Sequence, residues 1–270
     1  MAPAPGIGEK NRSRMFRLDF YTIFLGLLAF VSIIMPTQAF GSDTVEECQC
    51  VILLHGLGRT YGSMEKMARA LETAGFATAN MDYPSREYPI EKLALDVIPQ
   101  GLRRCDTLGA CRIHFVTHSL GGILVRYYLS QKRIQRLGRV VMLSPPNQGS
   151  EAADALLDMA FYQWFNGPAG QQLGTGPGSL VIQLGPVRYP VGVITGNTHA
   201  LFDAWLADLI PGPDDGKVSV ERAKVEGMAD FLSLPYAHPF IMEESEVIDQ
   251  TIHFLRQGRF KRHSSRATDD

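Results

Sequence analysis

A serine in a small-residue setting is the first sign of chemistry in this chain. Residues 116–122 read Val-Thr-His-Ser-Leu-Gly-Gly, after a β-branched apolar run and before residues 122–131, which have helical periodicity. A serine on such a sharp strand-to-helix turn projects its hydroxyl above a sheet, and the following N–H faces the reacting carbonyl. Gly121 meets the need for a small residue, whereas Thr117 stands where glycine is usual. Ser119 is therefore predicted to be a nucleophile, the alternative being a helix N-cap.

A nucleophilic serine needs a base and an orienting carboxylate. His238 lies in Leu-Pro-Tyr-Ala-His-Pro-Phe, between the last predicted strand and the final helical segment, and is the predicted base. Asp215 lies in the turn Pro-Asp-Asp-Gly-Lys-Val and is the predicted acid. Serine, aspartate and histidine then follow one another in an order that recurs in such triads. Asp214 is an alternative acid, and His199 is an alternative base.

Acyl transfer also needs donors for the developing oxyanion, and two backbone N–H groups meet that need. Leu120, directly after the serine, supplies the first in this interpretation. The second comes from Leu57, in the sequence Leu-His-Gly-Leu-Gly at residues 54–58, where a strand ends in a glycine-rich loop. That loop alone would also be consistent with a tight connection or an anion-binding turn. His118 adjoins the serine but is predicted to be a structural neighbour, because consecutive side chains at such a turn point apart.

Short apolar runs rich in β-branched residues alternate along the chain with longer segments of helical period. This alternation predicts an α/β protein with a mostly parallel sheet and helices on both faces. A glycine- and proline-rich stretch follows an apolar segment within residues 150–186, which we interpret as a short cap over a cleft. A surface excursion packed by its own aromatic residues is the alternative. The predicted strands are residues 51–55, 77–80, 113–117, 140–143, 191–195 and 231–234.

The composition is that of one globular domain. The chain has 270 residues, 45% of them hydrophobic, and a net charge of −2. With no basic face in its body, it gives no reason to expect nucleic acid as a partner. We assign residues 40–260 to the domain and residues 261–270 to a basic, disordered tail.

The first 39 residues have the pattern of a targeting segment. Basic residues precede an uncharged apolar run at residues 20–35, and Thr37 and Ala39 then stand at the −3 and −1 positions of a signal-peptide cleavage site. Export to the periplasm or the medium is predicted, with cleavage after Ala39. An uncleaved anchor formed by residues 20–35, which would associate with the membrane, is the alternative.

Four cysteines, Cys48, Cys50, Cys105 and Cys111, suit an exported protein that carries disulfides. A bridge between Cys105 and Cys111 would close a short loop, whereas Cys48 and Cys50 are too close for an ordinary bridge, and the pairing stays open. The spacing lacks two C-x₂-C knuckles, so no metal site is expected.

Taken together, these motifs resemble the α/β-hydrolase superfamily, specifically the bacterial triacylglycerol lipase and esterase group that is also similar to GPI-inositol deacylases. The resemblance covers roughly residues 51–260 and includes the loop at 55–57, the serine turn at 117–122 and the run at 141–150. It implies an α/β-hydrolase fold and hydrolysis of a small-molecule or lipid ester through an acyl-serine intermediate, with no cofactor. The short cap favours shorter acyl esters or membrane lipids presented singly.

Two other functions stay open at this stage. The same triad with an alcohol or amine as acceptor would make an acyltransferase or an amidase, because the acceptor is selected by the cleft and not by the triad. A lipid-binding protein that keeps the fold without turnover is the third interpretation.

Overall fold

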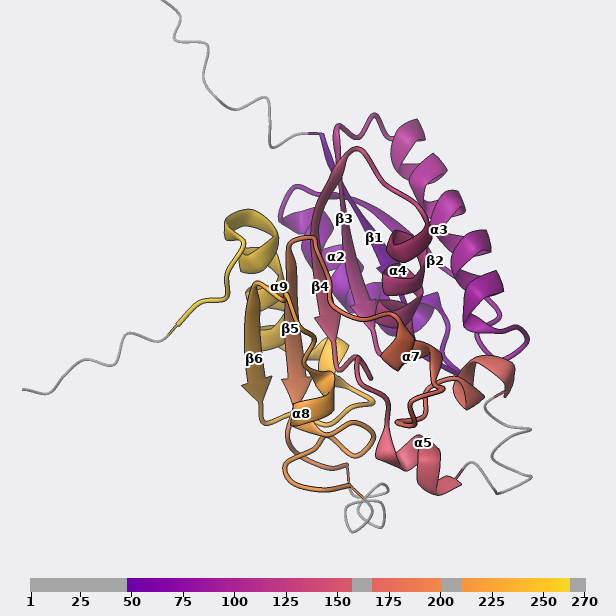
Figure 1. Cartoon of the computed structure of the whole chain (residues 1–270). Coiled ribbons are helices and arrows are strands. Elements are labelled where there is room, and N and C mark those ends of the chain that lie inside the picture. The colour runs from indigo at the N-terminus through magenta and orange to yellow at the C-terminus, as the bar shows by residue number, and fades with distance from the viewer. Residues whose placement is uncertain (1–47, 157–166, 201–209, 263–270) are drawn as a thin grey trace, which may run out of the picture. The chain divides into compact units, whose positions relative to one another are not determined.

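A six-stranded, wholly parallel sheet organises the domain. The computed structural model describes residues 48–156, 167–200 and 210–262. The strand order is β2-β1-β3-β4-β5-β6, and all the arrows point the same way in Figure 1. The strands are β1 (Gln49–Leu54), β2 (Ala77–Met81), β3 (Arg112–His118), β4 (Leu137–Leu143), β5 (Val191–Gly196) and β6 (Asp230–Leu234). Each predicted strand is confirmed, with its ends shifted by at most a few residues.

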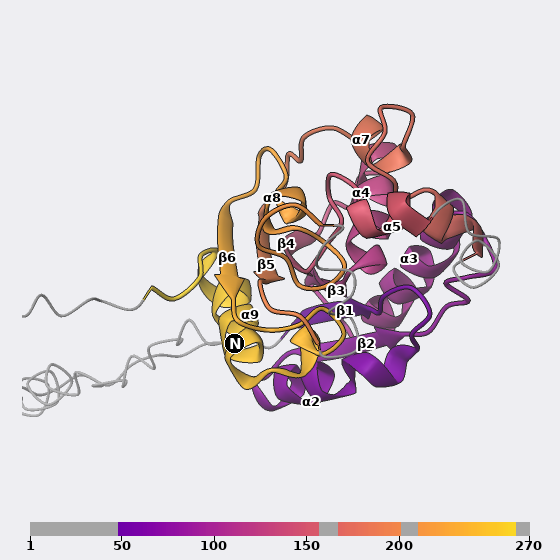
Figure 2. The same ribbon diagram turned by 90° about the horizontal axis from the view of Figure 1, so that it is seen from below.

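Helices cover both faces of the sheet, as the alternation of segments predicts. Figure 2 shows α3 and α4 on one side and α2 and α9 on the other. The helices are α2 (Glu65–Thr73), α3 (Ile90–Thr107), α4 (Leu120–Gln131), α5 (Glu151–Leu156), α7 (Leu180–Gln183), α8 (Val220–Ala223) and α9 (Ser245–Gln257). Short 3₁₀ helices span Tyr61–Met64 and Ile241–Glu243.

Period-two burial along the strands divides the core into two layers. In β1, Ile52 and Leu54 pack with residues of α3 and α4, whereas Val51 and Leu53 pack with residues of α2 and α9. Because both faces of the strand are covered, the whole run from Cys50 to Leu54 is buried. This explains why the strand reads as a continuous apolar stretch.

The strand order determines where a ligand can bind. The chain leaves β1 for β2 on one side and then returns to β3 on the other side of β1. The carboxyl ends of β1 and β3 therefore flank a topological switch point, the place where open α/β sheets bind ligands. The loop that contains Leu57 follows β1, and Ser119 follows β3.

Two disulfides tie the start of the sheet to α3 and to the loop after it. Cys48 pairs with Cys111, and Cys50 pairs with Cys105. The bridge between Cys105 and Cys111, considered from the sequence, is therefore wrong. Parallel pairing of β1 with β3 brings Cys48 beside Cys111, where the N–H of Cys111 donates to the carbonyl of Cys48 at 2.7 Å.

Part of the predicted cap, residues 157–166, lies outside the described residues. The described remainder contacts the domain at several points: Ser150 Oγ donates to the carbonyl of Lys217 at 2.6 Å, and Gln172 Oε1 accepts from the N–H of Ile90 at 2.7 Å. These bonds attach the segment to the acid turn and to the start of α3. Its role as a cap stays a prediction.

The two ends of the chain extend beyond the described part. The predicted leader or anchor lies outside it, as do residues 263–270 of the predicted tail. Lys261 and Arg262, the first two residues of the predicted tail, form ion pairs with Asp249 and Asp230. Of the helices that the structure describes, none is both long enough and apolar enough to cross a membrane.

Candidate active site

Ser119 occupies a strained turn at the carboxyl end of β3. Its backbone has φ 50° and ψ −119°, a region that costs a non-glycine residue free energy. The turn is held by the Ser119 N–H, which donates to the carbonyl of Leu143 at 2.9 Å, and by the Gly122 N–H, which donates to the carbonyl of Ser119 at 3.0 Å. A Cβ atom at Gly121 would lie only 2.6 Å from the carbonyl oxygen of Leu54. The glycine is therefore required because the turn lies directly against β1.

Thr117 fits in place of the usual glycine. Its side chain is buried, and its hydroxyl lies 3.4 Å from the carbonyl oxygen of Val141 in β4. Space for it comes from Gly122, where an added Cβ would lie 3.3 Å from the Thr117 hydroxyl. The missing glycine therefore leaves the turn intact.

The predicted acid and base contact each other directly. His238 Nδ1 lies 2.9 Å from Asp215 Oδ2, and the His238 N–H donates to the Asp215 carbonyl, also at 2.9 Å. The other carboxylate oxygen accepts from the N–H groups of Lys217 and Val218 at 3.1 and 2.9 Å. The acid is fully buried, and His238 is 8% exposed. This arrangement orients the imidazole through Nδ1 and leaves Nε2 for proton transfer.

The Asp215 carboxylate is held in its charged form. Burial raises its pKa and is the largest single influence, but the neighbouring His238, the hydrogen bonds to His238 and Val218 and the nearby Ser144 hydroxyl together outweigh it. Its pKa is therefore below the ordinary value for aspartate. An ionised acid at this position can stabilise an imidazolium as it forms.

His118 connects the serine turn to the base loop. Its Nε2 donates to the carbonyl of His238 at 3.0 Å, and the two ring centroids are 4.9 Å apart. Burial, followed by electrostatic interaction with His238 and Arg59, holds the pKa of His118 well below its usual range, so the ring stays neutral. The sequence predicted a structural neighbour. The structure adds that this neighbour holds the backbone of the predicted base.

The glycine-rich loop after β1 lies against the serine. A Cβ atom at Gly56 would lie 3.2 Å from the Cβ of Ser119 and 2.7 Å from His118 Nδ1. His55 Nδ1 donates to the carbonyl of Gly56 at 2.8 Å, and its ring stacks on Tyr83 with centroids 4.1 Å apart. Leu57 follows Gly56 directly in the chain.

The two predicted oxyanion donors come from different elements. Leu120 is the first residue of α4, and the N–H groups of a helix's first turn have no partner within the helix. The same helix end favours negative charge. Beyond Leu57, the N–H of Gly58 donates to Ser85 Oγ at 2.9 Å and anchors the far side of the loop. Leu57 and Leu120 stay predictions as oxyanion donors, and they follow β1 and β3, the two strands that flank the switch point.

The alternative acid and base form a pair of their own. His199 Nε2 lies 2.6 Å from Asp214 Oδ1, an oxygen that also accepts from the Gly216 N–H at 2.8 Å. The two adjacent aspartates are thus divided between two histidines. His238, and not His199, is the histidine bonded to His118 beside the serine.

Sequence reasoning missed two residues that shape the site. Ser144, directly after β4, has a positive φ of 48° and a fully buried side chain beside Asp215. Gly196 ends β5, where a Cβ would lie 2.0 Å from the carbonyl oxygen of Tyr236 and 2.8 Å from the Cβ of Asp215. Both follow predicted strands, so the rule that ligand sites lie at carboxyl ends could have singled them out.

Within the described part of the chain, no group of three or more His, Cys, Asp or Glu side chains is arranged to hold a metal ion.

Comparison with known proteins agrees with this architecture. A family model for the alpha/beta hydrolase fold matches residues 49–181. No curated protein sequence matches the chain. Among solved structures, the mature form of the Bacillus licheniformis lipase BlEst2 has a TM-score of 0.62 at 18% identity, covering 77% of this chain and 92% of that one.

Two further solved structures have the same fold. One, described as belonging to the metagenome-derived lipolytic enzymes LipS and LipT, has a TM-score of 0.54 at 14% identity and covers 78% of this chain and 94% of its own. The phospholipase PlaB from Legionella pneumophila has a TM-score of 0.53 at 20% identity and covers 65% of this chain and 45% of its own. The matched family model and the wholly parallel sheet show that this chain has the α/β-hydrolase fold.

Proposed function

We propose that the protein hydrolyses carboxylic esters through an acyl-serine intermediate. Ser119 Oγ attacks the ester carbonyl while His238 Nε2 takes its proton, and the oxyanion accepts hydrogen bonds from the N–H groups of Leu57 and Leu120. The tetrahedral species collapses, the carbon–oxygen bond to the alcohol breaks, and His238 returns the proton to the leaving alkoxide. Water then attacks the acyl-serine by the same route, releasing the acid and restoring the serine.

The observation that carries this proposal is the contact chain from the strained serine to the acid. Ser119 follows His118, His118 donates to the backbone of His238, and His238 Nδ1 meets the buried Asp215 at 2.9 Å. An imidazole that is oriented by a carboxylate can activate a nearby hydroxyl as a nucleophile, and His118 links the two segments that carry these groups. The lipases and esterases of similar fold support ester hydrolysis in general.

A cavity beside the proposed oxyanion loop offers space for part of an ester. It has a volume of about 510 Å³ and is lined by Gly58, Arg59 and Thr60 of that loop and by the segment around Ser85. Its polar lining suits the alcohol portion of an ester better than a long acyl chain. We therefore expect small-molecule or lipid esters as substrates, with short acyl chains preferred.

Export is part of the same proposal. Disulfides persist in the periplasm and outside the cell and are rare in the cytosol. The two bridges of the domain therefore favour an oxidising compartment, which agrees with the leader pattern in the sequence.

Labelling and hydrolysis together test the assignment. A fluorophosphonate probe should label the folded protein once, and Ser119→Ala should abolish both labelling and hydrolysis. The matched control is Ser130→Ala, which removes an exposed hydroxyl of the same helix that is bonded to the Tyr127 carbonyl. A series of p-nitrophenyl esters of increasing chain length then defines the acyl preference. Unchanged hydrolysis by Ser119→Ala would contradict the proposal.

The two aspartates provide a second test. Asp215→Asn should lower kcat by several orders of magnitude, because the amide would favour the wrong imidazole tautomer. Asp214→Asn should cost far less, because its contacts are with His199 and the Gly216 backbone. If the Asp214 variant suffers the larger loss, the acid has been assigned to the wrong residue.

A further inference from the structure

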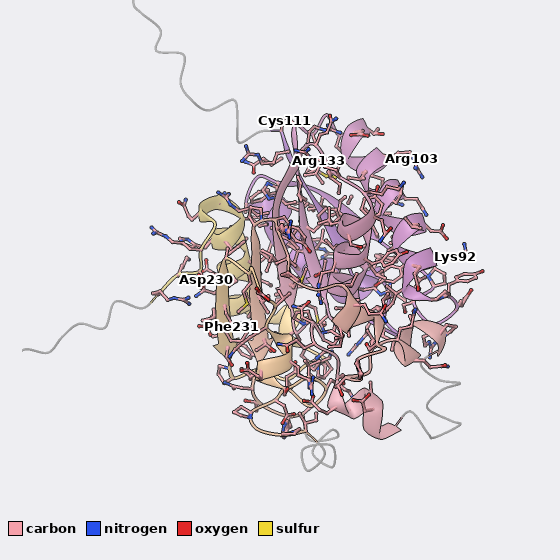
Figure 3. All side chains as sticks on the ribbon, in the orientation of Figure 1. Lys92, Arg103, Cys111, Arg133, Asp230 and Phe231 are labelled. Carbon is pink, nitrogen blue, oxygen red and sulfur yellow. A yellow bond between two sulfur atoms is a disulfide. The ribbon has the colours of Figure 1, made fainter. Side chains whose placement is uncertain are left out.

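A second cavity lies on α4, beyond the catalytic end of that helix. Its volume is about 540 Å³, and it is formed by the last turns of α4, the connection to β4 and the segment before β5. In Figure 3 its residue Arg133 lies toward the same end of the domain as Cys111, the end where β3 begins. Ser119 follows the opposite end of β3. The cavity is therefore separate from the proposed active site.

The charged residues that line this cavity are all cationic. They are Arg126, Lys132, Arg133 and Arg188, and no carboxylate is among the described residues of the lining. Lys132, Arg133 and Arg188 are exposed. Four positive groups around one cavity create a local potential that attracts an anion.

Arg126 is the unusual member of this group, because its guanidinium is buried and no carboxylate of the described residues pairs with it. The residue is only 4% exposed. Nη1 donates to the carbonyl and the side-chain oxygen of Asn147 at 2.6 and 3.3 Å, and Nη2 donates to the carbonyl of Gly185 at 2.7 Å. All of these partners are neutral. Arginine stays protonated in proteins, and buried charges are normally paired, so this charge lacks the compensation usual for its environment.

Two polar atoms at the cavity also lack partners. Among the described residues, neither Arg126 Nε nor the Tyr189 hydroxyl has a hydrogen-bond partner, although both atoms are buried. The great majority of buried polar atoms form a hydrogen bond, and a buried donor or acceptor left without one costs about 1–3 kcal/mol. Both residues line the same cavity. An oxyanion there could accept from both groups.

Apart from Ser130, Gln131 and Tyr189, the rest of the lining is apolar. Leu129, Ile134 and Leu184 contribute hydrocarbon next to the cationic groups. A free inorganic anion would leave this surface uncovered, whereas an amphiphile would bury it. Each methylene group buried is worth about 0.8 kcal/mol.

We infer that this cavity binds an anionic amphiphile, a hydrocarbon chain that ends in a carboxylate or a phosphate. The charged group lies against Arg126 and the Tyr189 hydroxyl, with Arg133 and Arg188 at the rim, and the chain covers the apolar lining. A fatty-acid anion and a lipid phosphate share this chemistry. Binding requires no turnover and is independent of the proposed hydrolase activity.

Titration calorimetry on the full chain carrying Ser119→Ala tests this inference without hydrolysis. The probes are octyl phosphate, octanoate, uncharged octanol and inorganic phosphate. Octyl phosphate or octanoate should bind at least tenfold more tightly than octanol and than inorganic phosphate, and the tighter of the two anions identifies the headgroup. If octanol or inorganic phosphate binds as tightly as both anionic amphiphiles, or if neither amphiphile binds below 10 mM, the inference is overturned.

Charge reversal at the rim locates the site. Arg133→Glu with Arg188→Glu changes two exposed side chains and should weaken binding about tenfold or more. The control, Lys66→Glu with Arg103→Glu, changes the net charge equally at exposed residues outside the cavity lining. Equal weakening in both double variants would overturn the inference. Tyr189→Phe should weaken binding several-fold with a normal fold by circular dichroism, and unchanged affinity would contradict the role of the hydroxyl.

Discussion

The contact between His118 and the base loop makes a prediction about catalysis that is independent of the triad side chains. His118→Phe keeps the ring and its packing but removes the donor to the His238 carbonyl, which lies 3.0 Å from Nε2. A buried carbonyl left without its donor costs about 1–3 kcal/mol. If the lost hydrogen bond displaces the base and the whole cost adds to the activation free energy, kcat falls roughly 5- to 150-fold, because about 1.4 kcal/mol corresponds to a factor of ten in rate.

The lower half of that range is expected, because two other contacts keep the base in place. The His238 N–H still donates to the Asp215 carbonyl, and Nδ1 still meets the carboxylate. KM should change little, because no substrate group meets His118 in the proposed mechanism. His118 acts here as a positioning residue.

The assay is pre-steady-state hydrolysis of a p-nitrophenyl ester, which separates the number of active sites from the rate of acylation. His118→Phe should keep a full burst amplitude and lose acylation rate. His118→Gln should recover most of that rate, because its amide nitrogen is as many bonds from the backbone as Nε2. His118→Asn should not, because its amide is one bond shorter. The reasoning is refuted if His118→Phe acylates at the wild-type rate, or if it loses burst amplitude while its acylation rate stays unchanged.

Three further predictions concern the turn, the bridges and a buried histidine. Gly121→Ala should lower kcat roughly 100-fold by displacing the serine turn from β1, whereas Gly122→Ala, whose new Cβ would meet side-chain atoms at 3.3 Å, should cost far less in the same assay. Replacing Cys50 and Cys105 by alanine should lower the free energy of unfolding, measured in urea, by about 3 kcal/mol, because the Cys48–Cys111 bridge still closes nearly the same loop. Removing both bridges should lower it by about 7 kcal/mol. Equal losses in the single-bridge and double-bridge variants would contradict this nesting. Burial, together with Arg139 and Arg112, lowers the pKa of His114 to about 4 in the native state. As the pH falls below about 6.5, His114 therefore binds a proton in the unfolded chain but stays neutral in the native protein. The free energy of unfolding should therefore fall by about 2 kcal/mol from this group between pH 7 and pH 5, and His114→Gln should remove that share of the slope.

Local patterns in the chain were sufficient to predict the sheet, its covering helices and the serine turn. Period-two and helical spacing arise within a few residues, so β1 and β3 could be recognised without knowledge of their partners. Ser119 could be found in the same way, because the strained turn needs its glycine within the same short segment. The alternation of elements also placed Asp215 in a turn between the last two strands and His238 in the loop after the last strand.

What the tertiary structure decided were the pairings between distant segments. Asp214 and Asp215 are adjacent and chemically identical, and only the folded chain directs one to His199 and the other to His238. The cysteine pairing likewise depends on the register of β1 beside β3. Arg126 reads in the sequence as one more charged residue of a helix, and its missing counter-charge becomes visible only once Asn147 and the segment before β5 close around it. Contacts of this kind depend on which surfaces meet in space, and residue spacing along a chain carries no such information.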